Sequence, residues 1–222
     1  KIPIRFETEP GEQMQVDFAS FKFGDKKFYA FVTILGYSRM LYAEFVKDQT
    51  ADTVIKCHEN AFNYYNGVPK YGLYDNMKSV IITRNAYGNG YHKLQSCFYD
   101  FSNHYGIIAR FCKPYNPQTK GKIERMITYL RYSFYTPFIA GKLDITLNLL
   151  NTKVMDWLNN VDNKRLHATT KVIPIESWHV ENGITNKIST YLNTKDIIHK
   201  SSYKLQHELD IYDALLAGGA VA

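Results

Sequence analysis

The order of apolar and polar positions predicts a chain that opens with three strands. Apolar and polar side chains alternate over residues 14–23, which is typical of a strand with one buried face. Residues 28–35 are almost wholly apolar and predict a strand buried on both faces. The turn residues Gly24-Asp25-Lys26 separate the two segments. Because residues 40–46 predict a third strand, we expect an antiparallel meander.

From residue 50 onward the pattern alternates between helices and short strands. Helices are predicted where apolar residues recur every three to four positions between signals such as Thr50 and Gly106. The predicted helices are residues 50–66, 92–105, 119–135, 143–160 and 186–193. Short strands are predicted at residues 71–75 and 107–111. This alternation predicts an α/β fold, with a mixed sheet and helices on both of its faces.

Composition narrows the class of protein. The chain has 222 residues, 45% of them hydrophobic, which is enough for one domain and an extension. A formal charge of +6 favours a polyanionic partner. The cysteines are far apart and form no CxxC pair, which argues against a cysteine zinc site and indicates a reducing compartment. With no membrane-length apolar run and no signal peptide, we expect a cytoplasmic protein; because residue 1 is not Met, we expect a fragment.

Three carboxylates occupy positions that favour metal chemistry. Asp17 stands between Val16 and Phe18 in a predicted strand, Asp75 ends a later strand, and Glu124 begins a helix. If the three converge, they would bind hard divalent cations, which prefer oxygen ligands. Two such cations can align a nucleophilic and a leaving oxygen at phosphorus. Convergence would therefore indicate an enzyme that cuts and joins nucleic acid.

Each carboxylate also has a structural interpretation. Asp17 could reach solvent or a turn amide, because an unpaired carboxylate is costly to bury. Asp75 precedes Asn76, and this pair is common in turns. Glu124 could lie on a solvated helix face, where ion pairs contribute a few tenths of a kcal/mol.

Cations surround Glu124 on its predicted helix. One face carries Lys120, Glu124, Thr128 and Arg131, and the opposing core stripe carries Ile123, Ile127, Leu130 and Phe134. Basic side chains at this helix and near Asp75 are candidates for phosphate contacts. These candidates are Lys78, Lys120, Lys122, Arg125 and Arg131. Surface solubility is the alternative role for Lys78 and Lys120.

Four stretches in order carry a resemblance to a known family. They are Gly11–Phe18, Tyr74–Lys78, Tyr115–Arg125 and Asn163–Thr170, the last followed by Pro174-Ile175-Glu176. Over roughly residues 11–180 the chain resembles the catalytic core of DDE transposases and retroviral integrases, most closely the IstA-type insertion-sequence transposases.

The resemblance implies a ribonuclease-H-like mixed five-stranded sheet flanked by helices, with Asp17 and Asp75 on adjacent strands. It implies that Asp17, Asp75 and Glu124 are catalytic and hold two Mg²⁺ ions, for which Mn²⁺ can substitute. It also implies cleavage at transposon ends and transfer of the 3′-hydroxyl to target DNA. Further implied partners are other copies of the chain on DNA and an IstB-type ATPase helper, in a bacterial, nucleoid-associated setting. The interval from Asp75 to Glu124, 49 positions (124 − 75), is longer than in retroviral integrases.

Three segments are expected within the chain. Residues 1–140 form the integrase catalytic core, residues 141–180 complete it with helices, and residues 181–222 form a carboxyl-terminal extension. In that extension Leu205, Leu209, Tyr212 and Leu216 share one stripe of a predicted docking helix.

Two other functions remain open from the sequence. One is a nuclease of the same fold that cuts without joining, and the other is an inactive DNA-binding or assembly module. A tyrosine recombinase is disfavoured because no His-x-x-Arg motif accompanies the many tyrosines.

Overall fold

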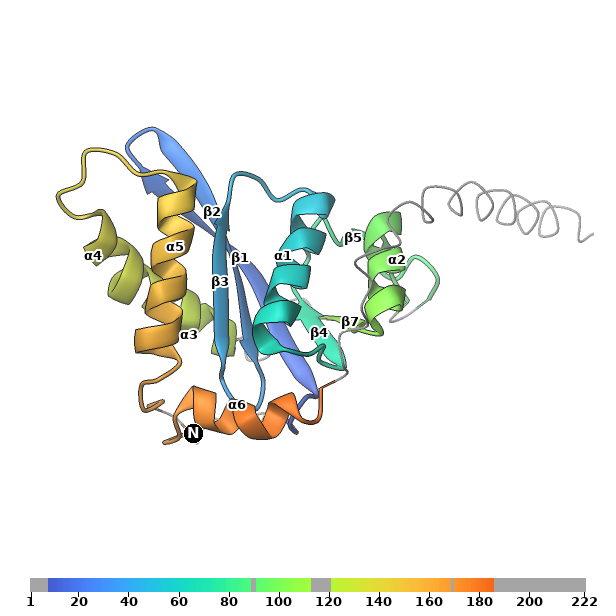
Figure 1. Ribbon diagram of the computed structural model, residues 1–222. Helices are drawn as coiled ribbons and strands as arrows, with labels where there is room; N and C mark the ends of the chain where they lie inside the picture. Colours follow the sequence, from blue (N-terminus) through green and yellow to red (C-terminus); the bar gives the residue numbers. More distant parts are fainter. Residues whose placement is uncertain (1–7, 89–90, 113–120, 169, 186–222) are drawn as a thin grey trace, which may run out of the picture. The chain divides into compact units, whose positions relative to one another are not determined.

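A five-stranded mixed sheet forms the centre of the computed structural model, which describes residues 8–88, 91–112, 121–168 and 170–185 (Figure 1). Its order is β3-β2-β1-β4-β7. These strands are β1 (Gln13–Phe23), β2 (Lys26–Leu35), β3 (Leu41–Val46), β4 (Tyr71–Tyr74) and β7 (Ile108–Phe111). The first three are antiparallel, whereas β4 and β7 run parallel to β1. The predicted meander and mixed sheet are therefore confirmed.

Helices cover both faces of this sheet (Figure 1). On one face lie α1 (Ala51–Tyr65) and α2 (Ser96–Tyr105). The other face carries α3 (Gly121–Tyr129) and α5 (Leu147–Trp157). Helix α3 continues through the π-helical turn η2 (Leu130–Tyr135) into α4 (Thr136–Ile139). Helix α5 continues into the π-helical turn η3 (Leu158–Asp162). A last helix, α6 (Pro174–Asn182), lies at one end of the sheet. Every described residue belongs to one compact unit, Lys1–Ile188.

The alternation in β1 sorts its side chains between two cores. Met14 and Val16 pack toward α1 and α2, whereas Ala19 and Phe21 pack toward α3 and α5. Strand β2 contributes to both cores, which explains its unbroken apolar run. The strand that carries Asp17 is thus held from both sides.

Capping residues bound the first helix at both ends, as predicted. The Thr50 hydroxyl accepts a hydrogen bond from the Thr53 backbone N–H, and Asn66 takes a left-handed conformation with φ 51°. The loop after Asn66 then leads directly into β4, so these caps set where the second acidic strand begins.

Several boundaries differ from the predictions. A hairpin of β5 (Ile81–Thr83) and β6 (Lys93–Leu94) was not predicted, and its pairing delays the start of the predicted 92–105 helix to Ser96. The predicted 143–160 helix begins later, at Leu147. Helix α6 was missed although Pro174 stands at its first position, where proline is favoured. The 186–193 helix and the predicted docking helix lie outside the described residues.

Helix α6 closes the end of the sheet where β1 begins. The Glu181 carboxylate is buried and accepts hydrogen bonds from the backbone N–H groups of Gly11 and Ser38, each at 3.1 Å. Burial raises the pKa of Glu181, and the hydrogen bonds oppose that rise. Because this contact ties α6 to β1, we propose that the core extends slightly past the predicted boundary at residue 180.

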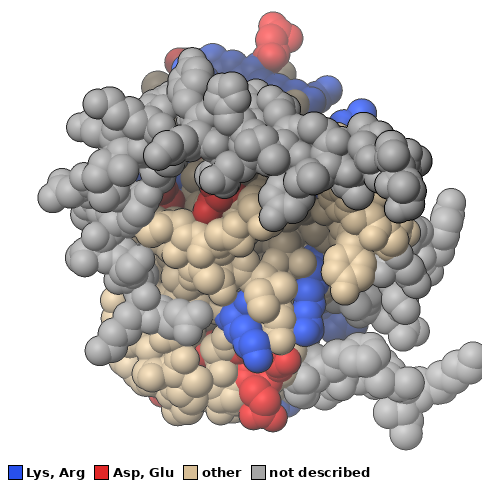
Figure 2. Space-filling model, turned by 90° about the vertical axis from the view of Figure 1, so that its right-hand side faces the viewer, with Lys and Arg blue, Asp and Glu red and all other residues tan. Residues whose placement is uncertain are grey.

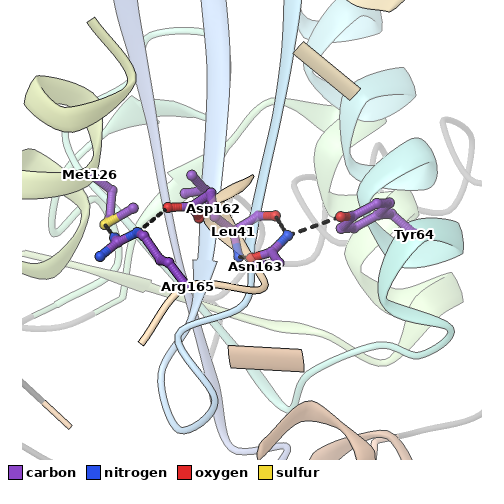
Figure 3. Close-up of polar contacts among 6 residues, drawn as sticks. All are labelled: Leu41, Tyr64, Met126, Asp162, Asn163 and Arg165. Atoms are coloured by element: carbon purple, nitrogen blue, oxygen red, sulfur yellow. Dashed lines mark hydrogen bonds and ion pairs between the residues drawn. The ribbon is translucent and has the colours of Figure 1, made fainter. Parts of the chain in front are cut away.

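A buried asparagine secures the edge strand β3 (Figure 3). The Asn163 side chain accepts a hydrogen bond from the Leu41 N–H and donates to the Leu41 carbonyl, both at 2.9 Å. Its amide also donates to the Tyr64 hydroxyl at 2.9 Å. Close by, Arg165 donates to Asp162 at 2.9 Å and stacks over the Tyr129 ring of α3 at 4.2 Å. This loop therefore joins the edge strand to α1 and α3.

In the described part of the chain, no helix is both long enough and apolar enough to cross a membrane.

Candidate active site

Parallel pairing of β1 with β4 brings the two aspartates to neighbouring strands. The register pairs Gln13 with Tyr71 and Gln15 with Leu73, so two residues further along both strands reach Asp17 and Asp75. Neighbouring strands lie about 4.8 Å apart. Asp17 is half-buried within β1, and Asp75 is exposed directly after β4. The sheet topology, not proximity in sequence, therefore juxtaposes these carboxylates.

Both aspartates line one pocket of about 390 Å³. Asp17 accepts a hydrogen bond from the Phe18 N–H at 2.9 Å, and Asp75 accepts one from the Asn76 N–H at 2.8 Å. These local bonds orient the two carboxylates at the pocket wall. The pocket is lined by Asp17, Phe18, Gln49, Asp75, Asn76, Met77, Lys78 and Ser79.

A buried hydrogen-bond chain supports the end of β4. The Tyr74 hydroxyl is 2.9 Å from His58 Nε2, and His58 Nδ1 is 2.7 Å from the Val54 carbonyl of α1. A carbonyl only accepts, so Nδ1 carries the proton and Nε2 accepts from Tyr74. Burial lowers the pKa of His58 to about 4, which keeps the ring neutral. Asp75 directly follows this anchored tyrosine.

A glycine leaves room for that tyrosine. A Cβ at Gly72 would lie 2.5 Å from the Tyr74 hydroxyl oxygen. Such a separation is too short for any side chain, so the Tyr74 ring takes its place over the strand only because residue 72 is glycine.

An arginine that sequence reasoning missed ties together the loops after β4 and β7. Arg84 Nε donates to the Asn76 side chain at 3.0 Å, and Nη1 donates to the Cys112 carbonyl at 2.9 Å. Gln95, at the start of α2, donates from its side chain to the Lys78 carbonyl at 3.0 Å. The β5–β6 hairpin between Lys78 and Gln95 lies within the interval from Asp75 to Glu124. Arg84 carried one sequence signal: it stands in a stretch without acidic residues.

Glu124 lies on α3 but does not line the pocket. It is exposed in the first turn, and the preceding residue, Ile123, donates its N–H to the Gln15 side chain at 3.2 Å. Gln15 precedes Asp17 by two positions, so this bond fixes the start of α3 beside β1. The predicted core stripe is confirmed, with Ile127 only partly buried.

Of the three predicted acids, Asp17 and Asp75 line one pocket, and Glu124 is not part of its lining. Within the described ranges, no three His, Cys, Asp or Glu side chains lie close enough together to hold a metal ion. Asp17 and Asp75 meet because strands pair in a fixed register, whereas Glu124 depends on where α3 begins. The eight residues before α3, 113–120, lie outside the described part.

The predicted phosphate-binding cations occupy different environments. Of the four that the structure describes, only Lys78 lines the pocket. Lys122 donates to the Gly36 carbonyl at 3.1 Å, and Arg131 donates to the Ser20 carbonyl at 3.0 Å. Arg125 is exposed. Lys120 lies outside the described residues.

A family model for the integrase core domain matches residues 7–117, a segment that includes both aspartates. The chain belongs to the integrase core domain family. This integrase core domain is 37% identical to a putative transposase for insertion sequence element IS5376 of Geobacillus stearothermophilus, across 98% of the chain and 55% of that relative. It is 30% identical to the transposase for IS21 of Pseudomonas aeruginosa, across 82% of the chain and 46% of that relative. The chain thus spans about half the length of these relatives.

Solved structures support the same fold. A chain of the simian T-cell lymphotropic virus intasome matches with a TM-score of 0.63 and 20% identity, over 79% of this chain and 57% of that one. The HTLV-2 integrase catalytic core, solved in complex with magnesium in a trimeric form, matches with a TM-score of 0.59 and 15% identity, over 78% of this chain and 100% of that one. These likenesses confirm the ribonuclease-H-like sheet flanked by helices.

Proposed function

We propose that this integrase core domain is the catalytic core of a transposase, which cleaves DNA and joins the freed 3′-hydroxyl to target DNA. The observation that carries the proposal is the pocket at which β1 and β4 present Asp17 and Asp75 together. Family membership directs this chemistry toward DNA, since the curated relatives are named as transposases.

The donors in the pocket fit magnesium. Carboxylate oxygens are the ligands that hard cations prefer, and Asp17 and Asp75 supply them from a pocket that also contains two side-chain amides, Gln49 and Asn76. We propose that Asp17, Asp75 and Glu124 hold two Mg²⁺ ions, or Mn²⁺ in their place. When bound, the ions neutralise charge on the phosphoryl oxygens and lower the pKa of an attacking hydroxyl.

The protein's own side chains would position the DNA. Lys78 lines the pocket, and its ammonium group suits a phosphate beside the scissile bond. Phe18 and Met77 add apolar surface to the lining of the pocket. Phosphoryl transfer depends mainly on positioning and charge stabilisation, so a protein nucleophile is unnecessary.

The remaining predicted cations are proposed to contact the DNA backbone outside the pocket. Arg125 is exposed on α3 and is free to approach it from that side. Lys122 and Arg131 would exchange backbone carbonyl partners for phosphates. Lys120 belongs to the same proposed set.

The test replaces each carboxylate with its amide. Asp17→Asn, Asp75→Asn and Glu124→Gln should abolish strand transfer and magnesium-dependent nicking while leaving DNA binding intact. Asp25→Asn, in the exposed β1–β2 turn, is the matched control and should keep full activity. Full joining activity in any one of the three site variants would refute the assignment of that residue.

Product analysis separates the proposal from its alternatives. Branched strand-transfer products indicate a transposase, nicked products alone indicate a nuclease, and binding without either indicates an assembly module. In crystals soaked with Mn²⁺, ligand distances of about 2.0–2.6 Å to the three carboxylates would support the metal site.

Assembly is part of the same proposal. We infer that the whole protein acts as a homo-oligomer on transposon ends in the bacterial cytoplasm, close to the nucleoid, with an IstB-type ATPase as helper. The mass of the complex on paired DNA ends, measured with and without the helper, tests this inference.

A further inference from the structure

The β5–β6 hairpin exposes aromatic side chains next to the pocket. Tyr87 and Tyr91 are each 70% exposed, and Ile82 is 51% exposed. The Tyr87 N–H donates to the Tyr91 carbonyl at 3.3 Å, so the two tyrosines lie close together along the hairpin backbone. Rings this exposed contribute little to the core, and two of them on one hairpin offer an aromatic surface on which a partner can stack.

The hairpin is also purely basic. Residues 76–99 contain Lys78, Arg84 and Lys93 but no Asp or Glu. The chain contains 21 acidic residues in all, none of them in this segment; residues 101–123 and 125–143 are likewise basic without Asp or Glu. Figure 2 views the side of the molecule on which α2 and β5 lie, and it shows a few Lys and Arg side chains among uncharged ones, with acidic side chains directly against them. A basic, aromatic element complements a polyanion that has flat bases.

The base of the hairpin is fixed relative to the pocket. Arg84 bonds both to Asn76, which lines the pocket, and to the loop after β7. At the other end the Gln95 N–H donates to the Val80 carbonyl at 3.0 Å. Lys78 and Ser79 line the pocket and β5 begins two residues later, so the base of the hairpin adjoins the pocket that the two aspartates line.

We propose that this hairpin is a DNA-binding element that holds the strand beside the reacting phosphate, with Tyr87 and Tyr91 stacking on unpaired bases and Lys93 contacting phosphate. Bases inside a duplex are already stacked on each other, so exposed rings can reach only bases that are unpaired. The inference rests on the proposed function, because it takes the pocket as the site of DNA cleavage and joining.

The test compares two DNA probes of equal length, a blunt duplex and a duplex with a short single-stranded overhang. Fluorescence anisotropy should show that Tyr87→Ala and Tyr91→Ala each weaken binding of the overhang probe by about tenfold, and leave blunt-duplex binding nearly unchanged. Tyr→Phe at either position should retain the affinity, because the ring is kept. Lys93→Ala should lower the slope of log affinity against log salt by about one for both probes.

A matched control comes from another exposed tyrosine. Tyr132 in η2 is 69% exposed, and Tyr132→Ala should bind both probes like the wild type. Thermal unfolding checks that each variant is folded, since exposed substitutions usually change stability by no more than about 0.5 kcal/mol.

The possible outcomes separate this inference from the proposed function. If Tyr87→Ala and Tyr91→Ala both bind the overhang probe as tightly as the wild type does, the hairpin proposal is overturned. The proposed function still stands in that case if the wild-type protein joins DNA. Unchanged DNA affinity with lost self-association would also overturn it and would indicate a protein interface. If the wild-type chain neither binds nor nicks either probe, both the function and the inference fail.

Discussion

Replacing Asn163 with alanine tests how the edge strand is held. This side chain is fully buried and makes two hydrogen bonds to the Leu41 backbone and one to Tyr64. Strand β3 lies at the edge of the sheet, so Leu41 pairs with β2 on one side only. The asparagine amide supplies both the donor and the acceptor that a further strand would have supplied.

The expected loss follows from the groups left behind. Asn163→Ala leaves the Leu41 N–H and carbonyl unpaired at a residue that is 0% exposed. Each unsatisfied buried group costs about 1–3 kcal/mol, and cavity collapse recovers part of that cost, so we expect a loss of about 3 kcal/mol. Tyr64 keeps its bond to Asn159 at 2.8 Å and should add little. For a domain of this size the loss corresponds to about 6–12 °C in Tm.

Urea unfolding and calorimetry measure this change. Asn159→Ala is the matched control, because Asn159 is exposed and bonds to the same tyrosine. We expect the control to lose no more than about 0.5 kcal/mol. If Asn163→Ala and the control are equally stable, the amide does not secure β3 and the reasoning is wrong.

Three other substitutions test the contacts that support the pocket. Burial lowers the pKa of His58 from 6.5 to about 4, so on acidification the His58 ring takes up its second proton in the unfolded chain before it does so in the folded one. The free energy of unfolding should therefore fall by about 3 kcal/mol as the pH drops from 6.5 to about 4. In urea unfolding, His58→Gln should flatten the pH dependence over this range. The same pH dependence in the variant would exclude His58 as its cause. Gly72→Ala should cost about 1–3 kcal/mol in thermal unfolding, because the new methyl group meets the Tyr74 hydroxyl, whereas Gly121→Ala meets no atom within 4 Å and should cost nothing. Arg84→Lys keeps the charge but loses the paired bonds to the two loops, so strand transfer should slow by about tenfold, a loss worth about 1.4 kcal/mol, with unchanged DNA affinity. A wild-type rate of strand transfer in this variant would show that Arg84 does not position the loops.

Local patterns were enough to predict most of the strands and helices. Alternation in β1, the apolar run of β2 and the caps of α1 are properties of neighbouring residues, and backbone preferences act over the same short range. The hairpin was harder to predict because its strands are only three and two residues long, too short to show a period. Residue type and position at strand and helix ends singled out Asp17, Asp75 and Glu124, and the resemblance to a family assigned them transposase chemistry.

Only the tertiary structure decided which side chains meet. Asp17 and Asp75 lie 58 positions apart (75 − 17), and they share a pocket because β1 and β4 pair in one parallel register. Gln49 joins that pocket from the loop before α1, and Asn163 reaches β3 from 122 positions away. Such contacts depend on how strands and helices pack together, which no local pattern records. Residue type and spacing therefore predicted the elements and the candidate acids, and packing determined the pocket, its supporting bonds and the position of Glu124 outside it.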